Sequence, residues 1–253
     1  PIAHHFGAGD VKALRKAEAN GIYLLALISL LMATLMAFLS RPILMLFNTP
    51  GNLLDDATTF ISLTFTGAFA MLFYSLLIGY MRAVGDSRTP LFFLILAYVL
   101  NILLDLLFIG YLHFGVEGAA LATILSQLVS AGFCVHTIRK HMPIFYLTRD
   151  DIRPSVREMF RLCRTSIPLG MLFSLVAVGI VVIQSAVNSL GSDAVAALSA
   201  SGKVQNALLA PLDAAGVGLA TFVSQNRGAR RFDRVRQGVR QSDLVFFSYA
   251  AIA

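Results

Sequence analysis

The apolar residues of this chain are gathered into long stretches with few charged residues, and this pattern restricts the fold more than any other feature. Each stretch is more than 20 residues long, which is the length a helix needs to cross a hydrocarbon core of about 30 Å. The six complete stretches run over about Ile22 to Phe47, Phe60 to Met81, Leu91 to Tyr111, Gly118 to Ile138, Ile167 to Leu190 and Ala194 to Val223. Turn signals such as Asn48-Thr49-Pro50-Gly51 separate them. The sequence therefore predicts six membrane-spanning segments.

The composition agrees with lipid as the solvent. Hydrophobic residues make up 57% of the 253 residues and charged residues 13%, whereas soluble domains carry about 25% charged residues. The spans are too long for barrel strands, which need about 9 to 11 residues and alternate in polarity. The predicted fold class is an all-α, polytopic membrane helical bundle.

The basic residues indicate the orientation of this bundle. Of the 20 Lys and Arg residues, 18 fall in one set of alternate connections, and the other set holds only Arg41 and Lys203. Because cytoplasmic connections collect Lys and Arg, the first set is predicted to face the cytoplasm. Orientation also accounts for the net charge of +6, so membrane lipids are expected as partners and nucleic acid is not.

The longest connection, Pro143 to Thr165, separates two groups of spans. Its apolar and basic residues alternate at helical spacing, which predicts an amphipathic helix lying in the cytoplasmic interface.

A short repeat links the two groups, because Phe6-Gly7-Ala8 resembles Arg227-Gly228-Ala229. Six spans separate the copies, so the repeat is parallel. The last apolar stretch, about Leu244 to Ala253, is too short to span a bilayer, and we expect the chain to be an internal piece of a longer protein.

One pair of spans carries the polar residues of greatest interest. Asn101 and Asp105 lie four residues apart in the third span, on one helix face and about 6 Å apart along the axis. Thr123 lies at similar depth in the next span. An intramembrane carboxylate usually marks an ion or proton pathway, and these oxygens suit Na⁺, while the carboxylate also suits H⁺. The alternative is that the three side chains only hydrogen-bond the helices together.

The remaining candidates carry less information. Asp213, beside Pro211, is a second intramembrane carboxylate, and Gln184 is a polar residue in the fifth span; both are secondary site candidates. The two cysteines lack the spacing of a metal site. No metal is expected beyond Na⁺ at Asp105, no organic cofactor is expected, and no catalytic set indicates an enzyme.

Several segments resemble the multidrug and toxin extrusion (MATE) family. They are Arg82-Ala83-Val84-Gly85-Asp86-Ser87-Arg88-Thr89-Pro90, Asn101-Ile102-Leu103-Leu104-Asp105, Gly115-Val116-Glu117-Gly118-Ala119-Ala120-Leu121-Ala122-Thr123 and Val223-Ser224-Gln225-Asn226-Arg227-Gly228-Ala229. The set covers nearly the whole chain and is specific as a set.

The resemblance implies twelve helices in two six-helix lobes. Residues 1–140 would be the N-terminal lobe from the end of helix 2 to helix 6, residues 141–165 the cytoplasmic linker helix, and residues 166–253 helices 7, 8 and the start of helix 9. It also implies a monomer in the bacterial cytoplasmic (inner) membrane that exports small organic, often cationic, compounds in exchange for H⁺ or Na⁺ by alternating access.

The resemblance is closest to the DinF-like and archaeal branch. Members of this branch place an Asn and an Asp on helix 5 and a Thr on helix 6 of a cation site, and Asn101, Asp105 and Thr123 fall at those positions. The span Ile167 to Leu190 lacks the carboxylate that another branch carries on helix 7. Two alternatives stay open: a lipid-linked precursor flippase of related architecture, and a membrane scaffold subunit that transports nothing.

Overall fold

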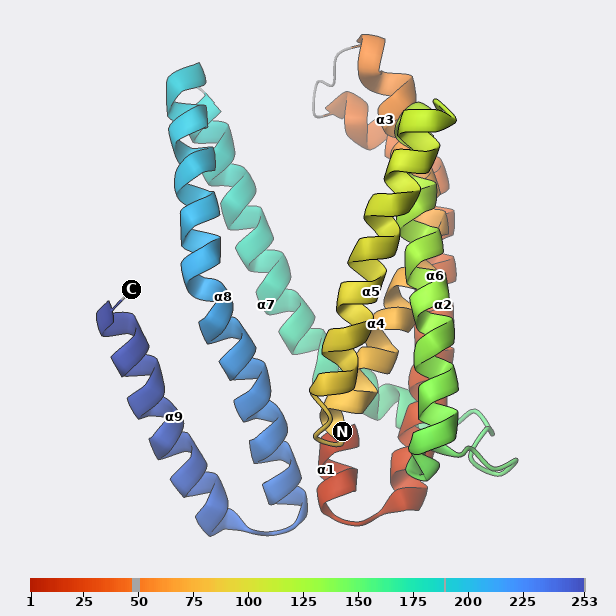
Figure 1. Cartoon of the computed structure of the whole chain (residues 1–253), viewed down its shortest axis with the longest axis vertical. Helices are drawn as coiled ribbons and strands as arrows, with labels where there is room; N and C mark the ends of the chain where they lie inside the picture. The colour runs from red at the N-terminus through yellow and green to blue at the C-terminus, as the bar shows by residue number, and fades with distance from the viewer. Residues whose placement is uncertain (47–50, 189, 253) are drawn as a thin grey trace. The chain divides into compact units, whose positions relative to one another are not determined.

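The computed structural model describes residues 1–46, 51–188 and 190–252 of the chain. The predicted end of the first span at Phe47 and most of the turn that follows it lie outside these residues. The chain divides into two compact units, one of Val11–Ser155 with Ile2 and the other of Val156–Ala253 with Pro1 and Ala3–Asp10. Figure 1 shows that the described residues form helices and connecting turns, as the predicted fold class requires.

The first unit is a bundle built around one central helix. Its helices are α2 (Val11–Leu46), α3 (Gly51–Thr66), α4 (Ala68–Ala83), α5 (Arg88–Asp105), the π-helix η1 (Leu106–Tyr111), α6 (Gly115–His141) and the 3₁₀-helix η2 (Pro143–Phe145). Helix α6 packs against α3, α4 and α5. It does so with small buried residues, among them Ala120, Ala122 and Ser126. Small side chains let membrane helices approach closely.

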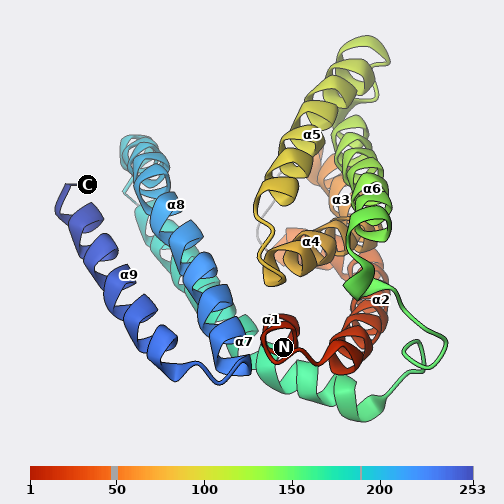
Figure 2. The ribbon, with the colours of Figure 1, turned by 60° about the horizontal axis from the view of Figure 1, so that its bottom comes forward.

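The second unit holds the remaining four helices, α1 (Ile2–Gly7), α7 (Val156–Asn188), α8 (Ser192–Gly228) and α9 (Phe232–Ile252). Helix α8 packs against α7 and α9, and Figures 1 and 2 both show α8 beside α9. The Tyr249 hydroxyl donates a 2.9 Å hydrogen bond to the Leu208 carbonyl and joins α9 to α8.

The two copies of the sequence repeat contact each other in this unit. A Cβ atom at Gly7 would lie 1.9 Å from the Gln225 carbonyl oxygen, and a Cβ atom at Gly228 would lie 2.0 Å from the His4 carbonyl oxygen. Each glycine thus faces the residue three positions before the other glycine. This reciprocal contact between α1 and α8 also explains why α1 belongs to the same unit as α8, whereas the sequence prediction places residues 1–10 with the N-terminal lobe.

Five helices among the described residues are long and apolar enough to cross a membrane, and the number becomes six if α3 and α4 count as one bent span. The chain is therefore a multi-pass membrane protein. The predicted span Phe60 to Met81 is not one straight helix, because α3 and α4 meet at Gly67 with a bend of 45°. A Cβ atom at Gly67 would lie 2.2 Å from a side-chain carbon of Ile124 on α6. The helices therefore bend at a residue where Ile124 of α6 leaves no room for a side chain.

This close approach predicts a double-mutant result. Gly67→Ala should lower the free energy of unfolding by about 1–3 kcal/mol, as overpacking typically does. Shortening the opposing side chain with Ile124→Ala should relieve the clash, so the Gly67→Ala penalty should largely disappear in the double variant. Thermal unfolding of the four proteins in the cycle measures the coupling. Additive effects of the two substitutions would show that the contact is not responsible for the bend.

The helical part of the connection after α6 differs from the prediction in its bounds. Only Pro143–Phe145 forms a short 3₁₀-helix, and α7 begins at Val156 and continues through Pro168 to Asn188. The amphipathic residues around Val156 to Arg164 are therefore the first turns of a long helix rather than a separate interfacial helix. Pro168 lacks a backbone N–H donor. Membrane helices tolerate such a proline because neighbouring groups and local adjustments of the helix satisfy the freed carbonyl.

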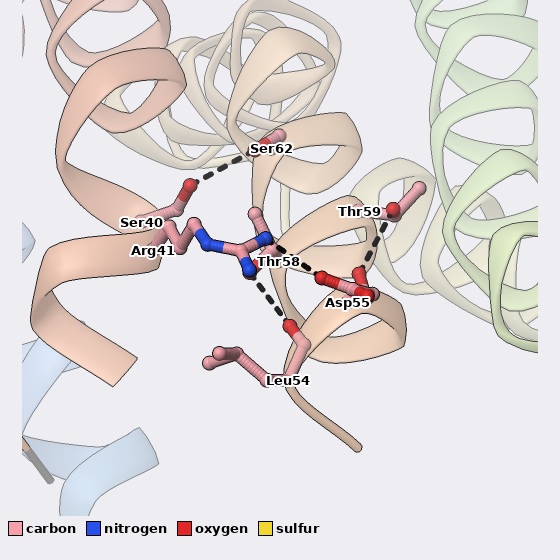
Figure 3. A network of polar contacts seen from close by, with 7 residues as sticks. All are labelled: Ser40, Arg41, Leu54, Asp55, Thr58, Thr59 and Ser62. Carbon is pink, nitrogen blue, oxygen red and sulfur yellow. Dashed lines mark hydrogen bonds and ion pairs between the residues drawn. The ribbon is translucent and has the colours of Figure 1, made fainter. Parts of the chain in front are cut away.

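Arg41, one of the two basic residues predicted outside the cytoplasmic set, links α2 to α3. Figure 3 shows its guanidinium donating to the Asp55 carboxylate at 2.7 Å, with a 3.1 Å Ser40–Ser62 hydroxyl contact nearby. The Arg41 and Asp55 side chains are 52% and 80% exposed. An ion pair this exposed contributes about 1 kcal/mol or less, so packing rather than charge holds α2 and α3 together.

Candidate functional site

The three leading candidates lie on the hairpin formed by α5, η1 and α6. These helices pack side by side in both views (Figures 1 and 2). Only residues 112–114 connect η1 to α6, so the connection is shorter than the sequence suggested. Gly115 takes a positive φ of 60° at the turn, a backbone conformation that glycine adopts without steric cost. The third and fourth predicted spans therefore form an antiparallel hairpin.

Asn101 and Thr123 meet across this hairpin. The Asn101 side-chain amide donates to the Thr123 hydroxyl over 3.4 Å, and that hydroxyl donates to the Ala119 carbonyl at 3.0 Å. The Ser126 hydroxyl donates to the Thr123 carbonyl at 2.9 Å. The contact fixes Asn101 and Thr123 at the same depth, and it leaves the Asn101 amide oxygen as an acceptor.

Asp105 lies one turn beyond Asn101, at the last residue of α5. Its Oδ1 atom is buried and has no hydrogen-bond partner among the described residues. The backbone changes from α- to π-helix directly after it. Segments of π-helix occur frequently at functional sites. A buried carboxylate oxygen without a donor is costly unless it is protonated or bound to a cation.

One residue of this region escaped the sequence interpretation. Gln127 lies four residues after Thr123 and therefore on the same face of α6. Its Oε1 atom is also buried without a partner among the described residues. The sequence would have allowed this prediction, because Gln127 is an amide inside an apolar span, as Asn101 is, and lies one helical turn from Thr123. Asn101, Asp105, Thr123 and Gln127 together form what we call the hairpin site.

The two secondary candidates both belong to the second unit. Asp213 lies on α8 and is exposed, and Gln184 lies on α7 and donates to Asn188 Oδ1 at 2.9 Å. No hydrogen bond connects Gln184 with Asp213 among the described residues. Groups of three or more His, Cys, Asp or Glu side chains suited to a metal are likewise absent from the described part of the chain. The hairpin site has a single carboxylate.

The described residues thus form a helical membrane bundle with one bent span, α3 and α4, and with a buried carboxylate oxygen at the end of α5. The sequence profile of the MatE family matches residues 2–107 and 168–253. The chain belongs to the MatE family.

Curated relatives agree with this assignment, and a solved structure has the same fold. The chain is 31% identical to the probable multidrug resistance protein YpnP of Bacillus subtilis, over 92% of this chain and 52% of the relative. It is 26% identical to the DNA damage-inducible protein F of Escherichia coli, over 99% of this chain and 56% of the relative. A MATE crystal structure in complex with MaD5 superimposes with a TM-score of 0.88 at 21% identity, over 98% of this chain and 57% of that one. The chain thus spans about half the length of these relatives.

Proposed function

We propose that the full-length protein is a secondary antiporter that exports small organic, often cationic, compounds in exchange for H⁺ or Na⁺, and that the hairpin site binds the coupling ion. One observation carries the proposal. The Asp105 carboxylate has a buried oxygen without a hydrogen-bond partner among the described residues, one helical turn from Asn101, which bonds to Thr123, in a chain of the MatE family. Relatives described as multidrug resistance proteins support an exported drug or metabolite as the substrate.

The chemistry of the site follows from its oxygens. The ionised Asp105 carboxylate and the amide oxygen of Asn101 are hard ligands, and the Thr123 hydroxyl is held in place by its bond to the Ala119 carbonyl. Binding of Na⁺ or H⁺ neutralises the one negative charge, which removes the cost of keeping it in the membrane. Site occupancy therefore changes the relative free energies of the two access states, and this difference couples ion movement to export.

The neutral ligands should matter less than the carboxylate. We expect Asn101→Ala and Thr123→Ala to raise the half-saturating ion concentration by less than about tenfold each, because one neutral hydrogen-bonding ligand contributes roughly 1 kcal/mol. Efflux from proteoliposomes of the full-length protein, with Na⁺ and pH varied independently, measures this and identifies the coupling ion. Gln184→Ala is the matched control and should leave the ion dependence unchanged. Complete loss of ion dependence in Asn101→Ala would contradict the expectation that the neutral ligands contribute less to ion binding than the Asp105 carboxylate.

The alternatives are less well supported. A flippase for lipid-linked precursors would be expected to have a strongly cationic cavity, yet the hairpin site holds one carboxylate and no basic residue. A scaffold subunit would need no buried carboxylate, and relatives are described as probable multidrug resistance proteins and, in one case, as an FAD transporter. The same relatives support the expectation that the protein is not an enzyme.

A further inference from the structure

A second buried carboxylate lies in the first unit, far along the sequence from the hairpin site. Glu18, on the first turns of α2, is only 6% exposed, and its Oε2 atom has no hydrogen-bond partner among the described residues. No ion pair joins Glu18 to a basic side chain in the described part of the chain. The backbone here is tightly held, since the buried Tyr80 hydroxyl donates to the Glu18 carbonyl at 3.0 Å. The side chain is therefore buried without the partner that a charged group needs.

The connection between α6 and α7 is hydrogen-bonded to residues of α2 that lie close to Glu18 in the sequence. Arg15 donates to the carbonyls of Ile144 at 2.9 Å and Pro143 at 3.0 Å. The Asn20 side-chain oxygen accepts from the Ser155 backbone amide at 2.8 Å, and the Tyr23 hydroxyl donates to the Ile152 carbonyl at 2.8 Å. Arg15 therefore directs these hydrogen bonds to backbone oxygens, and it forms no ion pair with Glu18 in the described part of the chain. Residues 143–155 form a cover over this end of the bundle.

A cavity of about 550 Å³ lies under this cover, and Glu18 is part of its wall. Phe73, Leu77, Ile138 and Phe145 contribute to the rest of the wall, which is largely apolar. Phe145 is itself fixed by stacking on Tyr80, with ring centroids 5.8 Å apart. The volume is within the range of small-molecule sites, which combine apolar walls with a few polar groups.

The charges around the cavity decide what would occupy it. Arg139 also lines it but is exposed, so water screens its guanidinium. Because Glu18 is buried without a partner, its carboxyl group is stable in the empty cavity in the protonated form. An ammonium ion that takes the place of this proton pairs with the carboxylate through a charge-assisted bond. Aromatic walls favour a cation as well. An anionic occupant would be repelled by the ionised carboxylate, and a neutral one would leave Glu18 in its protonated form without a charge-assisted bond.

We propose that this cavity is a binding site for a lipophilic ammonium ion, an amine with an aromatic or aliphatic body of drug-like size, whose N–H group bonds to Glu18. The site lies between α2, α4, α6 and residues 143–155, and it does not involve Asn101, Asp105 or Thr123. It therefore stands independently of the coupling-ion proposal. The occupant would contact both the cover and the bundle and would hold them together.

Protection of an engineered cysteine tests the site. Ile152 lines the cavity and is 44% exposed, so Ile152→Cys, with other accessible cysteines replaced, reports on it through maleimide labelling. The full-length protein is placed in phosphatidylcholine nanodiscs, which contain no primary-amine headgroup. Three probes of one shape are compared: 4-phenylbutylamine, 4-phenylbutan-1-ol and 4-phenylbutyrate.

The amine should slow labelling, and the alcohol should need a concentration at least about tenfold higher for equal protection, because it lacks the charge-assisted bond. Glu18→Gln should remove the difference between amine and alcohol, whereas Asp105→Asn and the control Glu158→Gln should keep it. Equal protection by all three probes, or stronger protection by the acid, would overturn the proposal. If Glu18→Gln folds poorly, the comparison of the three probes in the Ile152→Cys protein still decides the question.

Discussion

Asp105→Asn in the full-length protein should reduce ion-driven export by about 5- to 150-fold, the range that coupling free energies of 1–3 kcal/mol produce. The substitution keeps the shape of the side chain and removes the group that can be ionised. The buried Oδ1 atom then no longer carries charge, so occupancy of the site no longer distinguishes the two access states. Efflux assays in cells and membrane quantification of the same variant measure the effect.

The expected loss concerns coupling and not assembly. Membrane insertion and substrate binding by Asp105→Asn should match the parent, and Asp213→Asn, which changes an exposed carboxylate on α8, should have the smaller effect on export. If Asp105→Asn exports like the parent at every pH and Na⁺ concentration, the hairpin site only holds helices together. Lost insertion would instead favour a scaffold role.

Gly228→Ala should be the most destabilising alanine substitution on α8. The added Cβ atom would lie 2.0 Å from the His4 carbonyl oxygen and 2.9 Å from the Ala8 nitrogen. Both atoms belong to the backbone, so no rotamer change relieves the clash and α1 must move. The free energy of unfolding should fall by about 1–3 kcal/mol, measured by thermal or denaturant unfolding of the full-length protein.

Because Gly7 and Gly228 lie on the two sides of one contact, a second result is expected. Gly7→Ala should have a similar effect, and the double variant should lose less than the sum, because both substitutions break one contact. Gly216→Ala is the matched control on α8, since a Cβ atom there meets nothing within 4 Å. It should be neutral or stabilising by about 0.5–1 kcal/mol. A stabilising Gly228→Ala would show that α1 and α8 do not pack in this way.

The sequence predicted the number and class of the spans because hydropathy and bilayer thickness determine them almost alone. It did not predict the break at Gly67, which depends on the approach of Ile124 from α6. It also did not predict that α7 would extend back to Val156. Both features arise from packing between segments distant in the sequence, and periodicity along one segment carries no such information.

The features of the candidate site were also only partly predictable from the sequence. The spacing of Asn101 and Asp105 and the depth of Thr123 were readable from the sequence, because helix geometry fixes them. The π-helix after Asp105 and the unpartnered oxygen of Gln127 were not. Glu18 was missed for another reason. At the edge of an apolar span a charged residue is ordinarily a solvated one, and only the cover formed by residues 143–155 shows that it is buried.

Countertransport tests the account most directly. Full-length protein in proteoliposomes is given a substrate gradient without any imposed ion gradient, and the movement of Na⁺ and H⁺ is followed. If the protein is an antiporter coupled through Asp105, substrate flux should drive one of these ions in the opposite direction, and Asp105→Asn should abolish the ion movement. Substrate flux without ion movement, or ion movement that persists in Asp105→Asn, would contradict it.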